Sequence, residues 1–110
     1  MAVKITIENE TDSNFELQGE EVNQGHWAHQ GPAWGISPHT SASFQCEPFF
    51  WPIGCQGSVK YRYKNEEFSL IFNHTSSREG NDPYSETMPA SMKADHRGDN
   101  ESVIWTISKR

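Results

Sequence analysis

The histidines have the widest chemical repertoire in this sequence, and two of them lie close together. His26 and His29 are three residues apart in a segment rich in Gly and Pro, without a cysteine or acidic residue at a metal-ligand spacing. Surface histidines are therefore the preferred interpretation, with zinc ligands as the alternative. The sequence also lacks G-x-S-x-G, P-loop, G-x-G-x-x-G and paired C-x-x-C motifs. We expect no catalytic residue, no metal and no cofactor, and thus a protein that is not an enzyme.

An acidic stretch late in the chain is the second candidate for metal binding. Glu79, Asn81, Asp82 and Glu86 supply side-chain oxygens within eight residues, and such ligands suit Ca²⁺. Their spacing differs from that of an EF-hand loop. A solvated loop is the preferred interpretation, and a weak Ca²⁺ site is the alternative.

The only two cysteines, Cys46 and Cys55, enclose the unusual segment CEPFFWPIGC. Its prolines and glycine predict a loop, and loops are normally polar and lie on the surface. Phe49, Phe50 and Trp51 are consecutive, so they cannot all point inward, and an exposed aromatic cluster indicates a binding surface. A disulfide between the cysteines would stabilise the fold by roughly 2–3 kcal/mol. Two reduced, half-buried thiols are the alternative.

Other aromatic residues also fall in segments that are typical of loops or strand ends. For Trp27 and Trp34, covering an end of the fold is an alternative to binding a ligand. We predict a ligand-binding surface that is formed by six aromatic side chains: Trp27, Trp34, Phe49, Phe50, Trp51 and Tyr84.

The composition suits one small domain that spans residues 1–110. The hydrophobic fraction of 34% is low, but the aromatic fraction of 12% is too high for a disordered chain. A net charge of −6 argues against nucleic-acid binding. No apolar run approaches the ~20 residues of a membrane span, and the start MAVKITIENE is unlike a signal peptide. We therefore expect a cytosolic protein, or one released without a signal peptide, that associates peripherally with membranes.

Apolar and polar residues alternate with a period of two in several runs, and this pattern predicts β-strands. The clearest runs are Val3–Ile7, Val59–Tyr63, Phe68–Phe72 and Val103–Ile107. A tight turn at Asn65-Glu66 predicts a hairpin, whereas Ser91–His96 is expected to form a helical turn at most. The predicted fold is an antiparallel β-sandwich of six to eight strands, with helix below roughly 15% of residues. Its expected core contains Ile5, Ile7, Val59, Tyr61, Leu70, Phe72 and Trp105.

The order of glycines, prolines and aromatic residues along the chain carries a family resemblance. The features are Ile7-x-Asn-x-Thr11, Gly25-His-Trp27, Pro32-Ala-x-x-Ile-x-Pro38, Phe44 in a Ser-rich strand, Gly54-x-x-Gly-Ser-Val-x-Tyr61, Phe68-Ser-Leu-Ile-Phe72, Gly80-Asn-Asp-Pro-Tyr84 and Val103-Ile-Trp-Thr-Ile107. In these features the chain resembles the aegerolysins and the wider group of actinoporin-like proteins. The likeness spans nearly the whole chain.

The resemblance implies a small β-sandwich that recognises membrane lipids, and it connects the protein with cytolytic and defence systems. It assigns lipid binding to the six aromatic residues named above. The chain lacks the tryptophan-rich segment that aegerolysins carry before a late strand, and it lacks the amphipathic N-terminal helix of the actinoporins. We therefore do not infer lytic activity for this chain from the resemblance.

Three kinds of partner remain open for the aromatic surface. The leading hypothesis is a membrane lipid, because aromatic side chains favour the interface between headgroups and acyl chains. A glycan is the main alternative, since Trp and Tyr also stack on sugar rings. The third is a protein interface, either in a homo-oligomer or with a partner protein.

Overall fold

The computed structural model describes residues 2–50, 54–74, 82–99 and 101–110. These residues form ten strands and no helix. The strands are β1 (Val3–Glu10), β2 (Phe15–Gln24), β3 (His26–Trp27), β4 (Gly35–Ile36), β5 (Thr40–Glu47), β6 (Cys55–Tyr63), β7 (Glu66–His74), β8 (Tyr84–Thr87), β9 (Met92–Gly98) and β10 (Ser102–Lys109). Accordingly, none of the described residues belongs to a helix that could cross a membrane.

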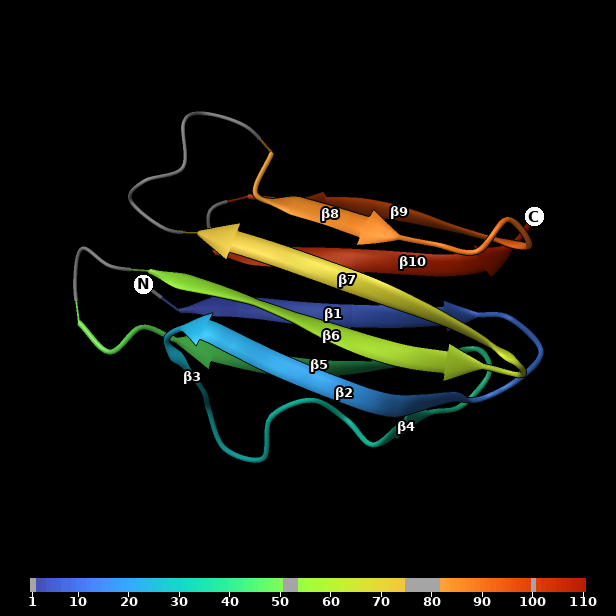
Figure 1. Cartoon of the computed structure of the whole chain (residues 1–110), viewed down its shortest axis with the longest axis horizontal. Helices are drawn as coiled ribbons and strands as arrows, with labels where there is room; N and C mark the ends of the chain where they lie inside the picture. Colours follow the sequence, from blue (N-terminus) through green and yellow to red (C-terminus); the bar gives the residue numbers. More distant parts are fainter. Residues whose placement is uncertain (1, 51–53, 75–81, 100) are drawn as a thin grey trace.

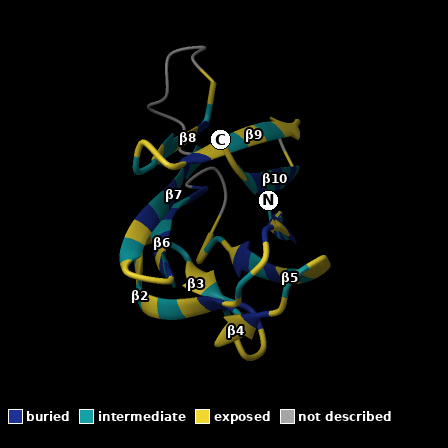
Figure 2. Cartoon of the chain, turned by 90° about the vertical axis from the view of Figure 1, so that its right-hand side faces the viewer, coloured by how far each residue is buried: buried dark blue, intermediate teal, exposed yellow. Residues whose placement is uncertain are grey.

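The strands make two sheets that pack face to face (Figures 1 and 2). The first sheet has the order β3-β5-β1-β10-β9, and the second has the order β4-β2-β6-β7-β8. The predicted β-sandwich is confirmed. The number of strands is ten rather than six to eight, because the two-residue strands β3 and β4 and the polar edge strand β9 give no clear alternating pattern.

One pairing departs from the predicted antiparallel arrangement. The first and last strands, β1 and β10, lie side by side and run parallel, with Ile5 opposite Val103 and Ile7 opposite Trp105. The other pairings are antiparallel. Side chains alternate between the two faces of a strand in both arrangements, so the pattern of residues could not distinguish them.

Two local predictions are wrong. The turn between β6 and β7 is formed by Lys64 and Asn65, one residue earlier than expected, and Lys64 has a positive φ of 56°. The segment predicted as a helical turn belongs to β9, which pairs with β10 over its whole length. Its sequence, MKADHRG, is not typical of a strand. Pairing with a neighbour decides its conformation, as often happens at sheet edges.

The core between the sheets consists of the inward faces of the predicted strands. All seven residues expected there are buried, with exposed fractions of 0–2%. Phe15, Phe44, Phe68 and Met92 are among the other members of the same cluster. The alternation of residues thus predicted the inward faces correctly.

A buried asparagine joins the first turn to the second sheet. Asn9 is fully buried, and its amide nitrogen donates to the carbonyls of Ser13 (2.9 Å) and Ile36 (2.8 Å). Its side-chain oxygen accepts from the backbone nitrogen of Thr11 (3.0 Å) and from its hydroxyl (2.6 Å). Because a buried polar group is costly unless it is hydrogen-bonded, Asn9 and Thr11 have a structural role.

Candidate functional site

A disulfide holds together the two ends of the connection between β5 and β6. Cys46 at the end of β5 and Cys55 at the start of β6 form a disulfide between the two sheets, and both residues are fully buried. Gly25 lies against this bridge with a φ of +96°, and a Cβ atom there would approach the Glu47 carbonyl oxygen to 2.7 Å and both sulfurs to 3.0 Å. Only glycine fits, because L side chains rarely adopt this backbone conformation.

Two of the aromatic residues predicted to bind a ligand are exposed in this connection between β5 and β6. Phe49 is 71% exposed and Phe50 is 62% exposed. The Phe49 ring contacts the ring of His26 in β3, with 5.1 Å between the centroids. We call Phe49 and Phe50 the aromatic tip; it lies at the left-hand end of Figure 1, where β5 ends. Trp51, which was predicted to belong to the same surface, lies outside the described residues.

The other predicted aromatics do not join the aromatic tip. Trp34 is 87% exposed, but it precedes β4, and its carbonyl accepts from the backbone nitrogen of Leu17 near the start of β2. The tip lies beside β3, which follows the end of β2. Trp34 and the tip are therefore at opposite ends of β2 and do not form one cluster.

Trp27 is half-buried and packs against the core, whereas Tyr84 belongs to the core. The Trp27 ring packs on Phe44 and Phe72, at centroid distances of 5.5 and 5.8 Å, and its indole nitrogen donates to the Glu20 carboxylate. It thus covers the end of the core, which was the alternative role considered for it. Tyr84, which was predicted to bind a ligand, is buried, with only 4% of it exposed.

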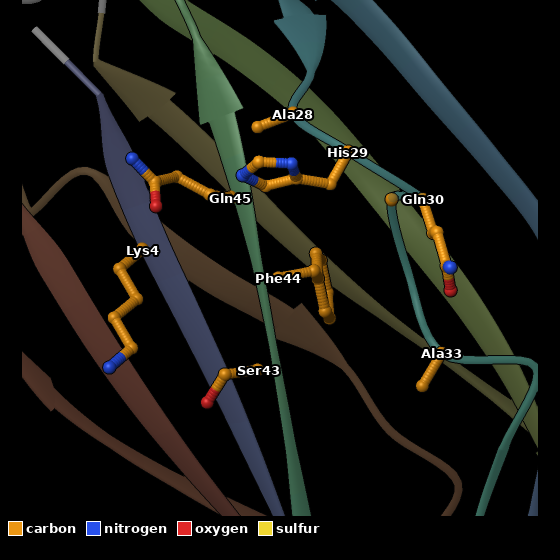
Figure 3. Close-up of a pocket in the computed structure, with 9 residues that line it drawn as sticks. Lys4, Ala28, His29, Gln30, Ala33, Ser43, Phe44 and Gln45 are labelled. Atoms are coloured by element: carbon orange, nitrogen blue, oxygen red, sulfur yellow. The ribbon is translucent and has the colours of Figure 1, made fainter.

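A pocket of about 400 Å³ lies on the flank of the sandwich, between β5 and the loop that follows β3 (Figure 3). Its polar lining groups are the side chains of Lys4, His29, Gln30, Ser43 and Gln45. We call it the flank pocket. The backbone nitrogen of Ala28 donates to the Gln45 carbonyl (2.8 Å), so the loop is tied to β5. This pocket could not be predicted from the sequence, because Lys4 and Gln45 are far apart along the chain and become neighbours only through strand pairing.

A polar cluster closes the opposite edge of the sandwich, where β8 and β9 face each other. His96 lies 2.6 Å from Asp82 through Nε2 and 2.9 Å from Glu86 through Nδ1. The indole of Trp105 donates to the same Glu86 oxygen (3.0 Å). Burial alone would lower the pKa of His96, but the hydrogen bond to Asp82 and the charge of Glu86 outweigh burial, so the pKa is raised.

The carboxylates of this cluster belong to the stretch considered for Ca²⁺. Asp82 and Glu86 both contact His96, while Glu79 and Asn81 lie outside the described residues. Within the described part of the chain, no three His, Cys, Asp or Glu side chains are arranged to hold a metal ion. The cluster therefore has the geometry of an ion pair that links the sheets.

Replacing His96 by glutamine is expected to reduce the free energy of unfolding more at about pH 6 than at about pH 9. The pKa is raised in the folded state. The stabilisation is therefore complete below the unfolded value of about 6.5, and it is lost as the pH rises through the higher folded pKa. Urea unfolding of both proteins at the two pH values measures this difference.

A matched control for this experiment is His39→Asn. The His39 side chain is 72% exposed and has a φ of 59°, a conformation that asparagine tolerates. Little change is expected for it at either pH. An equal loss at both pH values for His96→Gln would show that its charge does not stabilise the fold.

The fold and these surfaces define a small β-sandwich that presents an aromatic loop at one end. No protein-family model and no curated protein matches this chain. Among solved structures, the chain is similar to the crystal structure of the lipid binding protein Nakanori, with a TM-score of 0.74 and 12% sequence identity. The match covers 99% of this chain and 71% of that one. At this identity, the similarity shows a common fold.

Proposed function

We propose that this protein is a non-enzymatic lipid-binding protein that attaches to membranes through its aromatic tip. The observation that carries this proposal is the exposure of two adjacent phenylalanines, at 71% and 62%, at one end of the sandwich. Side chains of this size are usually covered in a folded protein, and a cluster that is not covered marks an interaction site.

The anchoring of the tip suits insertion into a lipid surface. The disulfide and Gly25 restrain the base of the connection, so less conformational freedom is lost when the rings are immobilised. Removing one phenylalanine side chain from water is worth about 1.5–3 kcal/mol. Two such rings supply enough free energy for weak, reversible membrane attachment.

The shared fold gives independent support. Nakanori is described as a lipid binding protein, and its structure matches almost all of this chain. Because unrelated functions can occupy one fold, this support is secondary to the exposed tip. A lipid ligand also agrees with the net charge of −6, since insertion of apolar rings requires no basic surface.

Replacing Phe49 and Phe50 together by serine is expected to weaken binding to phosphatidylcholine vesicles by at least about thirtyfold. The melting temperature should hardly change, because exposed side chains contribute little to folding. Co-sedimentation with vesicles and thermal unfolding measure the two effects on the same samples.

The matched control is Trp34→Ser, which removes an exposed aromatic residue at the other end of β2. Vesicle binding should persist in this variant. Unchanged vesicle binding in the phenylalanine variant would contradict the proposal.

Trp34 favours a glycan as the second candidate ligand, because a tryptophan that is 87% exposed offers a free ring face to a sugar. Glycan-array binding that is lost in Trp34→Ser but kept in the phenylalanine variant would establish that function. Size-exclusion chromatography tests the remaining alternative. A dimer that dissociates when Phe49 and Phe50 are replaced would assign the tip to a protein interface.

A further inference from the structure

The flank pocket is lined by hydrogen-bond donors and lacks acidic side chains. Its described lining residues include the ammonium group of Lys4, the ring of His29, the amide of Gln45 and the hydroxyl of Ser43, and no Asp or Glu. Neutral or charged, a histidine ring carries at least one N–H donor. Figure 3 shows these groups on β1, on β5 and on the loop after β3, around one hollow. Such a lining favours a ligand with several acceptor oxygens.

Lys4 supplies a positive charge that the protein leaves unpaired. Four other basic side chains, namely Arg62, Lys64, Arg97 and Lys109, lie within 4.0 Å of carboxylates. Among the described basic residues without such a partner, Lys4 is the one that lines the flank pocket. Within the described part of the structure, Lys4 has no such partner. In a chain with a net charge of −6, an unpaired ammonium group beside neutral donors is suited to accept an anion.

The shape of the donor set favours phosphate over a quaternary ammonium group. Phosphate presents several strong acceptor oxygens in different directions, and lysine is a common partner for it. Binding of a choline group would require exposed aromatic faces around the cation. The one aromatic residue among the described lining residues is Phe44, which is only 6% exposed.

When the aromatic tip is in the membrane, the flank pocket lies close to the lipid headgroups. Gln45 precedes Phe49 by four residues on the same chain, a span of at most about 13 Å. Apolar groups of peripheral proteins enter roughly 5–10 Å into the boundary between headgroups and acyl chains. With Phe49 at that depth, the pocket lies among or just above the headgroups.

We infer that the flank pocket binds the phosphate group of a lipid headgroup, while Phe49 and Phe50 enter the apolar layer beneath it. This inference rests on the proposed membrane attachment. A free phosphate ion has the same chemistry, so the experiment must separate the two sources.

The decisive variant is Lys4→Gln, which removes the charge and keeps a polar side chain of similar size. The wild-type protein is expected to bind vesicles of phosphatidylcholine with phosphatidic acid at least about tenfold more tightly than vesicles of phosphatidylcholine alone. Lys4→Gln should abolish that preference. The matched control is Lys60→Gln, because Lys60 is also exposed and lies in β6 of the other sheet. It should keep the preference within about twofold.

Titration with inorganic phosphate, followed by NMR, identifies the source. In wild-type protein the backbone amides of His29 and Gln45 should shift, and in Lys4→Gln they should not. These shifts together with the vesicle preference support the lipid headgroup. The shifts without a vesicle preference would overturn the lipid headgroup as the source and assign the pocket to soluble phosphate. If Lys4→Gln and Lys60→Gln lose the vesicle preference equally, the flank pocket is not the phosphate site. The absence of both the amide shifts and the vesicle preference in the wild-type protein would lead to the same conclusion.

The proposed membrane attachment is tested by a separate experiment, the vesicle binding of the phenylalanine variant. If Phe49 and Phe50 prove irrelevant to binding of phosphatidylcholine vesicles, the proposed function fails. The phosphate titration still reports on the pocket, because it needs no membrane.

Discussion

Replacing Trp105 by alanine is expected to lower the free energy of unfolding by about 3–5 kcal/mol, the range for large aromatic core residues. Trp105 is completely buried in β10, and its ring packs on Tyr84 with 5.6 Å between the centroids. Truncation leaves a cavity that the surrounding strands can fill only in part. It also removes the indole donor from Glu86, so a carboxylate of the other sheet loses a hydrogen bond.

This loss is large for a domain of 110 residues, because native proteins are stable by only about 5–15 kcal/mol. Urea unfolding monitored by circular dichroism measures the change. Trp34→Ala is the matched control: it removes the same side chain from a site that is 87% exposed, and a change below about 0.5 kcal/mol is expected. Similar losses in both variants would show that burial in β10 does not determine the contribution of Trp105.

Removing the Cys46–Cys55 disulfide is expected to lower the free energy of unfolding by roughly 2–3 kcal/mol. The bridge closes a short loop, because its cysteines are nine positions apart in the sequence, and it restricts the unfolded chain accordingly. The variant to use replaces both cysteines by alanine, because both are fully buried and serine would bury a polar group. Chemical denaturation of oxidised protein and variant gives the difference.

A reducing agent provides the control for the disulfide prediction. Reduced wild-type protein should unfold close to the double alanine variant, and the variant should not respond to the reducing agent. Vesicle affinity should also fall on reduction, because Phe49 and Phe50 would then be ordered only upon binding. Stability that is unaffected by reduction would contradict the predicted contribution.

The inward faces of the main strands could be predicted from the sequence. Val59, Tyr61, Leu70 and Phe72 are apolar at every second position, and only one face of a strand can be buried against a core when such residues alternate with polar ones. The aromatic tip could also be anticipated, because three consecutive large side chains in a Pro-rich loop cannot all be buried. These inferences depend only on local geometry along the chain.

The tertiary structure decided how these elements are combined. The parallel pairing of β1 with β10 and the strand conformation of β9 depend on which strands become neighbours, and alternation is the same for any neighbour. Likewise, aromatic residues that looked equivalent have different surroundings: Tyr84 is buried and Trp34 is exposed. Lys4 and Gln45 line one pocket because β1 and β5 pair across a long sequence separation. Contacts of this kind arise when segments that are distant in the sequence pack together. A local pattern of residues does not predict them.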